Sequence, residues 1–158
     1  MLMAMTQGQP WFDRTFEFTF PIERYPNICA RLRGTPARLE EISRDCAAAL
    51  LVRKPDGKWS AQEHAGHLAD LEPLWMARVN DFVSGKSALS VADLRNQKTD
   101  QANHNSRSII EILKEFRTAR SQLGRSARAG VVFAHAAASA LDAADAAGRS
   151  PVLCGGTR

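Results

Sequence analysis

The stretch Trp59–Arg78, WSAQEHAGHLADLEPLWMAR, decides the fold that the sequence predicts. Ser60 and Glu63 stand three residues apart just before an apolar pattern, which is the spacing of a capping box at a helix start. Large apolar residues then recur at helical spacing, so one stripe of the helix is expected to face a core: Leu68, Leu71, Trp75 and Phe82. The stretch therefore predicts a long amphipathic helix that packs against other helices.

This helix is expected to run to about Ser84, with Pro73 kinking or breaking it near Glu72. An earlier helix is expected to begin at Thr35 and Pro36, a capping residue followed by proline at the first helical position. Its apolar stripe would be Leu39, Ile42, Cys46 and Leu50. A third helix is predicted over residues 109–123, because apolar residues match the helical period and Gly124 follows as a stop.

The remaining segments carry weaker patterns. Phe16, Phe18 and Phe20 alternate with polar residues, which predicts an extended strap, with Trp11 and Phe12 as further anchors. The polar residues 86–104 predict a long connection, with one short helical turn near residues 91–95. Alanine dominates residues 127–147, so a weak fourth helix is expected over 134–147. Together these patterns predict an all-α, up-and-down four-helix bundle over residues 11–147, with loose tails at 1–10 and 148–158.

Composition limits the classes of protein to consider. The chain of 158 residues has no run of eighteen apolar residues and no apolar segment after its first methionines, so we expect no membrane span and a cytoplasmic location. Cys29, Cys46 and Cys154 are odd in number and scattered, which argues against a disulfide framework and a thiolate zinc site. The net charge is +4, but the arginines are dispersed, which favours a solvated surface over nucleic-acid binding.

Histidine is the first place to look for chemistry, and the chain has four. His64 and His67 are three residues apart on the predicted helix and could share a metal, although a surface His64 and a hydrogen-bonded His67 explain the spacing more simply. Gly66 leaves room for a group to approach His67. Glu63 precedes His67 by four residues and could orient an imidazole, but its capping role already accounts for it.

Several other polar and aromatic residues are candidates with a simpler interpretation. Asp70 and Glu72 could act as acids or bases, but exposed helix charges are the simpler expectation. Trp59 and Trp75 are expected to fill the core rather than to form a ligand platform. His104 lies among polar residues at a helix entrance, which favours a cap or loop role. Cys46 is expected to pack in the core, because no electropositive neighbour would activate its thiol.

The motifs at Gly57-Lys58-Trp59-Ser60, Glu63 and His67-Leu68-Ala69-Asp70 resemble those of the DinB-like superfamily. The segments 31–39, 105–108 and 115–117 support the resemblance, which extends over roughly residues 11–123. It implies a four-helix bundle that is often dimeric, with a divalent metal (zinc, nickel, manganese or iron) held by three histidines. One of these histidines matches His67, and the other two come from the fourth helix, four residues apart. The resemblance implies a hydrolase or thiol transferase acting on a small molecule.

The chain departs from this family pattern after the third helix. It has one histidine there, His135, and Ser139 stands four residues later. His67 is therefore the one metal ligand we assign, and the sequence predicts weak or absent metal binding and an impaired enzyme. The alternative is an inactive bundle that acts as an interaction module. A missing fourth helix would leave apolar stripes exposed, so a homodimer is expected, with no nucleic-acid or membrane partner.

Overall fold

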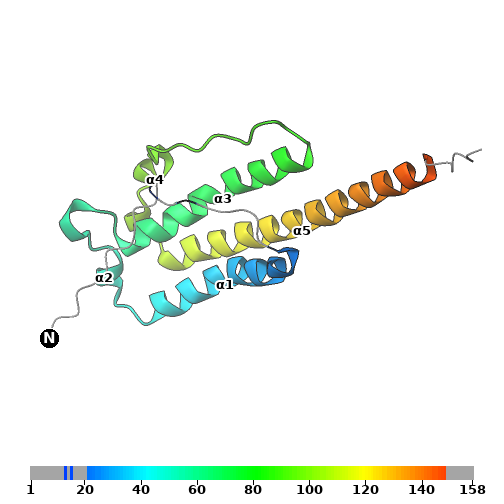
Figure 1. Ribbon diagram of the computed structural model, residues 1–158. Helices are drawn as coiled ribbons and strands as arrows, with labels where there is room; N and C mark the ends of the chain where they lie inside the picture. Colours follow the sequence, from blue (N-terminus) through cyan, green and yellow to red (C-terminus); the bar gives the residue numbers. More distant parts are fainter. Residues whose placement is uncertain (1–12, 14, 16–20, 149–158) are drawn as a thin grey trace, which may run out of the picture.

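A computed structural model of the chain describes residues 13, 15 and 21–148, and for residues 131–148 it describes the backbone alone. Three long helices lie side by side: α1 (Tyr25–Arg44), α3 (Ala61–Val83) and α5 (Ile109–Gly148) (Figure 1). α5 packs against both α1 and α3 and so forms the centre of the bundle. The described residues include no β-strand, which confirms the all-α prediction.

Short helices lie before α1 and within the connections between the three long helices. η2 (Ile22–Arg24) precedes α1, while α2 (Ala48–Leu51) and η3 (Pro55–Gly57) join α1 to α3. α4 (Gln97–Gln101) and η4 (His104–Ser106) join α3 to α5, so the helical turn expected near 91–95 forms a few residues later. The predicted strap at Phe16–Phe20, its anchors Trp11 and Phe12, and the tails 1–10 and 149–158 lie outside the described residues.

α1 begins at Tyr25, ten residues before the start predicted from Thr35 and Pro36. Pro36 lies inside the helix and is buried, although proline removes one backbone hydrogen bond from a helix interior. The carbonyl group that loses its partner is that of Leu32, four residues earlier. The Thr35 hydroxyl and the Arg38 guanidinium donate to the neighbouring carbonyl oxygen of Arg31, at 2.9 and 3.0 Å. The prediction of a helix start was wrong because a proline within a helix carries the same local signal.

α3 runs without interruption from Ala61 to Val83, so the break predicted at Pro73 does not occur. Pro73 lies on the exposed side of the helix, where water can bond to the carbonyl group that the proline leaves unpaired. The stop predicted after Ser84 is confirmed, because Gly85 follows with a φ of +66°. One uninterrupted helix therefore carries this stretch from Ala61 to Arg78, with Ser60 as its N-cap.

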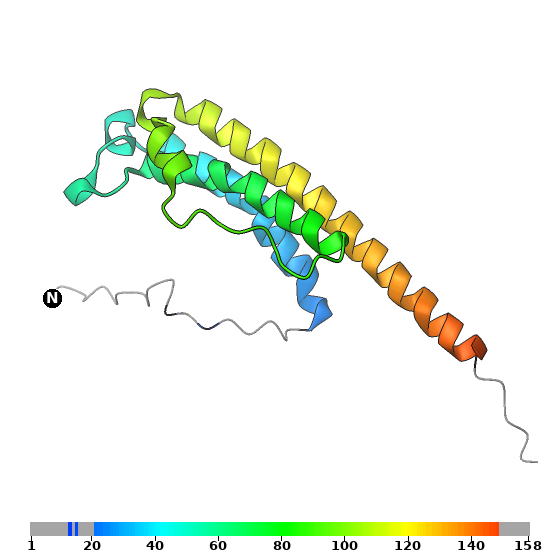
Figure 2. The same ribbon diagram turned by 90° about the horizontal axis from the view of Figure 1, so that it is seen from above.

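α5 is a single helix of 40 residues, in which Gly124 does not end the third helix. The alanine-rich residues 134–147 are helical as expected, but they prolong α5 instead of turning back as a separate fourth helix. α5 therefore extends well past the ends of α1 and α3 (Figures 1 and 2). Despite this length, no helix in the described part of the chain is long and apolar enough to cross a membrane.

The core lies where α3 and α5 meet, around the fully buried Ile112 and Phe116. Ala65 and Leu113 join it, and Leu39 is the member of the predicted α1 stripe that packs there. Other residues predicted to face the core are exposed: Ile42, Cys46, Leu50, Trp75 and Phe82. The predicted stripe of the first helix was wrong beyond Ile42, because α1 ends at Arg44, so Cys46 lies in the connection and Leu50 lies on α2. Trp75 and Phe82 do lie on α3, but no helix among the described residues covers them.

Candidate functional site

Ser60 is the N-cap of α3, and the predicted capping box is confirmed. The Glu63 backbone N–H donates to Ser60 Oγ at 3.1 Å, and the Ser60 N–H donates to Glu63 Oε2 at 2.8 Å. The Ser60 hydroxyl also donates to Asn105 Oδ1 at 2.7 Å, which ties the start of α3 to η4. Lys54 Nζ lies 2.7 Å from Glu63 Oε1. The carboxylate of Glu63 is therefore occupied by capping, as the simpler interpretation predicted.

His67 lies on α3 under the short helix α4. Its ring is partly buried against Trp59, with ring centroids 5.0 Å apart, and its Nδ1 lies 3.0 Å from Thr99 Oγ1. Trp59 is itself tied to α4, because its indole N–H donates to Asp100 Oδ1 at 3.0 Å. Burial lowers the pKa of the His67 imidazole, although the nearby Asp70 carboxylate opposes that shift. Burial therefore favours the neutral form of the His67 imidazole.

The hydrogen bond to Thr99 determines the tautomer of His67. The Thr99 hydroxyl donates its one proton to Asp70 Oδ2 at 3.0 Å, so its oxygen can only accept from His67. His67 therefore carries its proton on Nδ1 and keeps a lone pair on Nε2, which has no hydrogen-bond partner among the described residues. An imidazole held through one nitrogen with the other nitrogen unprotonated is in the state required of a metal ligand or a general base.

Asp70 is the centre of this hydrogen-bond network. Its Oδ2 accepts from both Thr99 and His104 Nε2, the latter at 2.8 Å, and Lys98 Nζ lies 3.4 Å from Oδ1. Burial raises the pKa of the Asp70 carboxyl, but the hydrogen bonds from His104 and Thr99 outweigh burial and lower it overall. The expectation of an exposed helix charge was therefore wrong: the Asp70 side chain is only 12% exposed and joins α3 to α4 and η4.

His104 is buried against α3 rather than acting as a cap. It makes no capping hydrogen bond and is 2% exposed, and its Nδ1 has no partner among the described residues. Gln62 Nε2 donates to the backbone carbonyls of His104 and Arg107, at 2.7 and 2.8 Å, and holds η4 in place. The space predicted beside Gly66 is filled by this second imidazole and not by a ligand of His67.

The other candidates do not assemble into a metal centre. His64 is exposed and meets the edge of Trp59, with ring centroids 5.5 Å apart. Glu72 is not the exposed charge expected but is buried in an ion pair with Arg120. The side chain of His135 lies outside the described residues. Within the part of the chain that is described, no three residues of the ligating types lie close enough to hold a metal ion together.

A family model described as the DinB superfamily matches residues 31–147, which is most of the chain. The chain belongs to the DinB superfamily. The match includes α3, α4 and η4, and so it spans the whole network around Asp70. No curated protein and no solved structure matches this chain.

Two members of this DinB-like site, Thr99 and His104, were not predicted from the sequence. Thr99 belongs to no sequence motif that would single it out. Its role depends on the packing of α4 against α3 in the folded protein. His104 had one available signal, which is the glycine at position 66. A glycine within an amphipathic helix costs stability relative to alanine, so it indicates close approach by another group, here the His104 ring.

Proposed function

We propose that this DinB-like protein derives from metal-dependent enzymes acting on small molecules, of the hydrolase or thiol transferase class, and that its activity is impaired. In this proposal His67 is the remaining ligand of a divalent metal such as zinc, nickel, manganese or iron. The observation that carries it is the hydrogen-bond chain from Asp70 through Thr99 to Nδ1 of His67, from which we infer a proton on Nδ1 and a free lone pair on Nε2.

The described residues supply one such imidazole and no complete ligand set. A single histidine binds a divalent cation far more weakly than the three protein ligands of a catalytic zinc site. We therefore infer weak metal binding at His67 and assign no catalytic step to the metal. The free thiols of Cys29 and Cys46 fit a reducing compartment such as the cytoplasm.

Metal titration of the full chain, purified without chelators, tests this proposal. Zinc or nickel binding is followed by competition with a chromophoric chelator for the wild type and for His67→Ala. The matched control is His64→Ala, because His64 lies on the same helix and also contacts Trp59 but is exposed. We expect weak binding that His67→Ala abolishes and His64→Ala preserves. Tight stoichiometric binding, or binding unchanged in His67→Ala, would contradict the proposal.

The second candidate function is an interaction module that acts as a homodimer. Trp75 and Phe82 are seven residues apart on one face of α3 and are 38% and 66% exposed, and Val83 beside them is 45% exposed. Large apolar side chains exposed on one helix face are typical of an interface in soluble proteins. We infer that a second copy covers this face.

Light scattering after gel filtration tests the dimer. The wild type is expected to elute as a dimer, and Phe82→Asp is expected to convert it to a monomer, because a charge at the interface would be buried without a partner. Val91→Asp is the control, since Val91 is 91% exposed in the connection after α3. A wild-type monomer at high concentration would exclude this candidate.

A further inference from the structure

A cleft between α1 and α5 carries an unusual concentration of positive charge. Its volume is about 320 Å³, and four of its lining residues are arginines: Arg33 from α1, and Arg120, Arg125 and Arg128 from α5. Apolar walls come from Leu32 and Leu123, and none of the ten lining residues is acidic. The cleft is separate from the His67 network, whose members belong to α3, α4 and η4.

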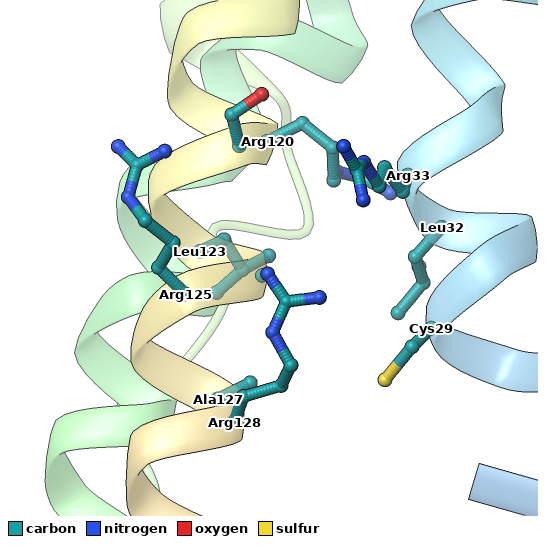
Figure 3. Close-up of a pocket in the computed structure, with 10 residues that line it drawn as sticks. Cys29, Leu32, Arg33, Arg120, Leu123, Arg125, Ala127 and Arg128 are labelled. Atoms are coloured by element: carbon teal, nitrogen blue, oxygen red, sulfur yellow. The ribbon is translucent and has the colours of Figure 1, made fainter. Parts of the chain in front are cut away.

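The four arginines differ in whether an acidic residue neutralises them and in the direction of their side chains. Arg120 is neutralised by Glu72 on α3, with Nε 2.8 Å from Oε1. Arg33 and Arg128 form no hydrogen bond or ion pair with any described residue, and Figure 3 shows their guanidinium groups directed into the gap between the two helices. Arg125 is directed away from α1 in the same view. Two arginines without an ion-pair partner among the described residues therefore line the gap between α1 and α5.

We propose that this cleft binds a small organic anion. Arg33 and Arg128 bind its carboxylate or phosphate group, because guanidinium groups match the oxygen geometry of both anions. The apolar part of the ligand packs against Leu32 and Leu123. The volume lies at the small end of the range found for ligand pockets, which suits a short-chain anion rather than a macromolecule.

Isothermal titration of the full chain with octanoate, octyl phosphate and octanol tests this site. Both anions are expected to bind more tightly than octanol, and the tighter anion identifies the preferred head group. Arg33→Gln and Arg128→Gln are each expected to weaken anion binding about tenfold, the loss typical of one charge-assisted hydrogen bond. Arg44→Gln is the matched control, because it removes the same charge from an exposed position of α1 that does not line the cleft.

Three results would overturn the proposal. Octanol binding as tightly as the anions would show an apolar site with no role for charge. An equal loss in Arg44→Gln and Arg128→Gln would show general attraction to a basic surface instead of a defined site. No binding of either anion would exclude the site outright. All three arginines are exposed, so their substitution leaves the fold intact, and circular dichroism verifies that it does.

Discussion

The imidazole ring of His104 occupies the space beside α3 that a side chain at position 66 would need. A Cβ atom built on Gly66 would lie 2.3 Å from Cγ of His104, far inside van der Waals contact. His104 is held on its other sides by Asp70 and by the bond from Gln62 to its carbonyl oxygen. Asp70 therefore holds the ring at Nε2 and Gln62 holds the backbone of the same residue, which keeps the imidazole against Gly66.

Gly66→Ala is accordingly expected to destabilise the protein by about 1–3 kcal/mol, the usual cost of overpacking a core. The measurement is the free energy of unfolding in urea. Gly124→Ala is the opposite control, because no atom lies within 4 Å of a Cβ built at that helical position. It should stabilise α5 by up to about 1 kcal/mol. Equal effects of the two substitutions would contradict the packing of His104 against Gly66.

The buried ion pair between Glu72 and Arg120 joins α3 to α5. The Glu72 side chain is 1% exposed and the Arg120 side chain is 10% exposed, and Glu72 Oε2 has no partner among the described residues. Arg120→Met is expected to cost about 3–5 kcal/mol, because it leaves the Glu72 carboxylate buried and uncompensated. Chemical unfolding followed by circular dichroism measures this loss.

Restoring neutrality should rescue that loss. The double variant Glu72→Leu with Arg120→Met removes both charges, and we expect it to recover most of the lost stability. Arg117→Met is the surface control, since Arg117 lies on the same helix but pairs with Glu40 at the exposed side of the bundle. It is expected to change the unfolding free energy little. A double variant no more stable than Arg120→Met would refute this account of the pair.

Asp81 makes stability depend on pH at the end of α3. The ammonium group of Lys86 and the hydroxyl and backbone N–H of Ser90 hold its carboxylate and lower the pKa of Asp81 to about 2. A depressed carboxyl pKa contributes stability above its unfolded value, about 3.9, and loses it as the pH falls towards the folded value. Unfolding free energies measured from pH 5 to pH 2 should therefore fall steeply below pH 4.

Asp81→Asn should reduce that pH dependence, because the substituted side chain does not titrate. Asp56→Asn is the control, since Asp56 is exposed and forms no hydrogen bond or ion pair with the described residues. In Asp56→Asn the unfolding free energy should depend on pH as it does in the wild type. If the unfolding free energy fell equally with pH in the wild type and in Asp81→Asn, other carboxyl groups would be the cause of the acid sensitivity.

The features predicted correctly from the sequence depend on neighbouring residues. The capping box of Ser60 and Glu63 is complete within four residues, so its geometry follows from the local pattern. The stop at Gly85 is of the same kind, because a glycine with positive φ ends the helix. Gly124 shows the limit of this signal: glycine permits a helix end but does not require one, and α5 continues through it.

The features missed depend on contacts between distant residues. Thr99 and His104 form hydrogen bonds with Asp70, from which they are 29 and 34 residues away in the sequence. No local sequence pattern predicts these contacts. Trp75 and Phe82 have the spacing of core residues, but burial also requires a covering element. The chain continues as one long helix, α5, and does not fold back into a separate fourth helix that could cover them. The exposure of Trp75 and Phe82 could therefore not be inferred from the sequence of α3 alone.

The tautomer of His67 is a direct consequence of the Thr99 hydroxyl. Long-range nitrogen-proton NMR correlation should show the proton on Nδ1 of His67 at pH 7, because Thr99 accepts there while donating to Asp70. Thr99→Val keeps the shape of the side chain but removes the acceptor. The His67 proton should then move towards Nε2, and the unfolding free energy should fall by about 1–3 kcal/mol, the cost of an unsatisfied buried group.

Thr99→Ser is the control for this prediction, because serine keeps both the donor and the acceptor of the bridge. It should preserve the Nδ1–H tautomer while losing only a methyl group. Burial lowers the pKa of His67, so the folded protein resists protonation and should lose stability as the pH falls below the ordinary histidine value of about 6.5. A wild-type spectrum with the proton on Nε2 would contradict the hydrogen-bond directions assigned from Asp70 through Thr99 to His67. It would also contradict the proposal that His67 binds a metal through Nε2.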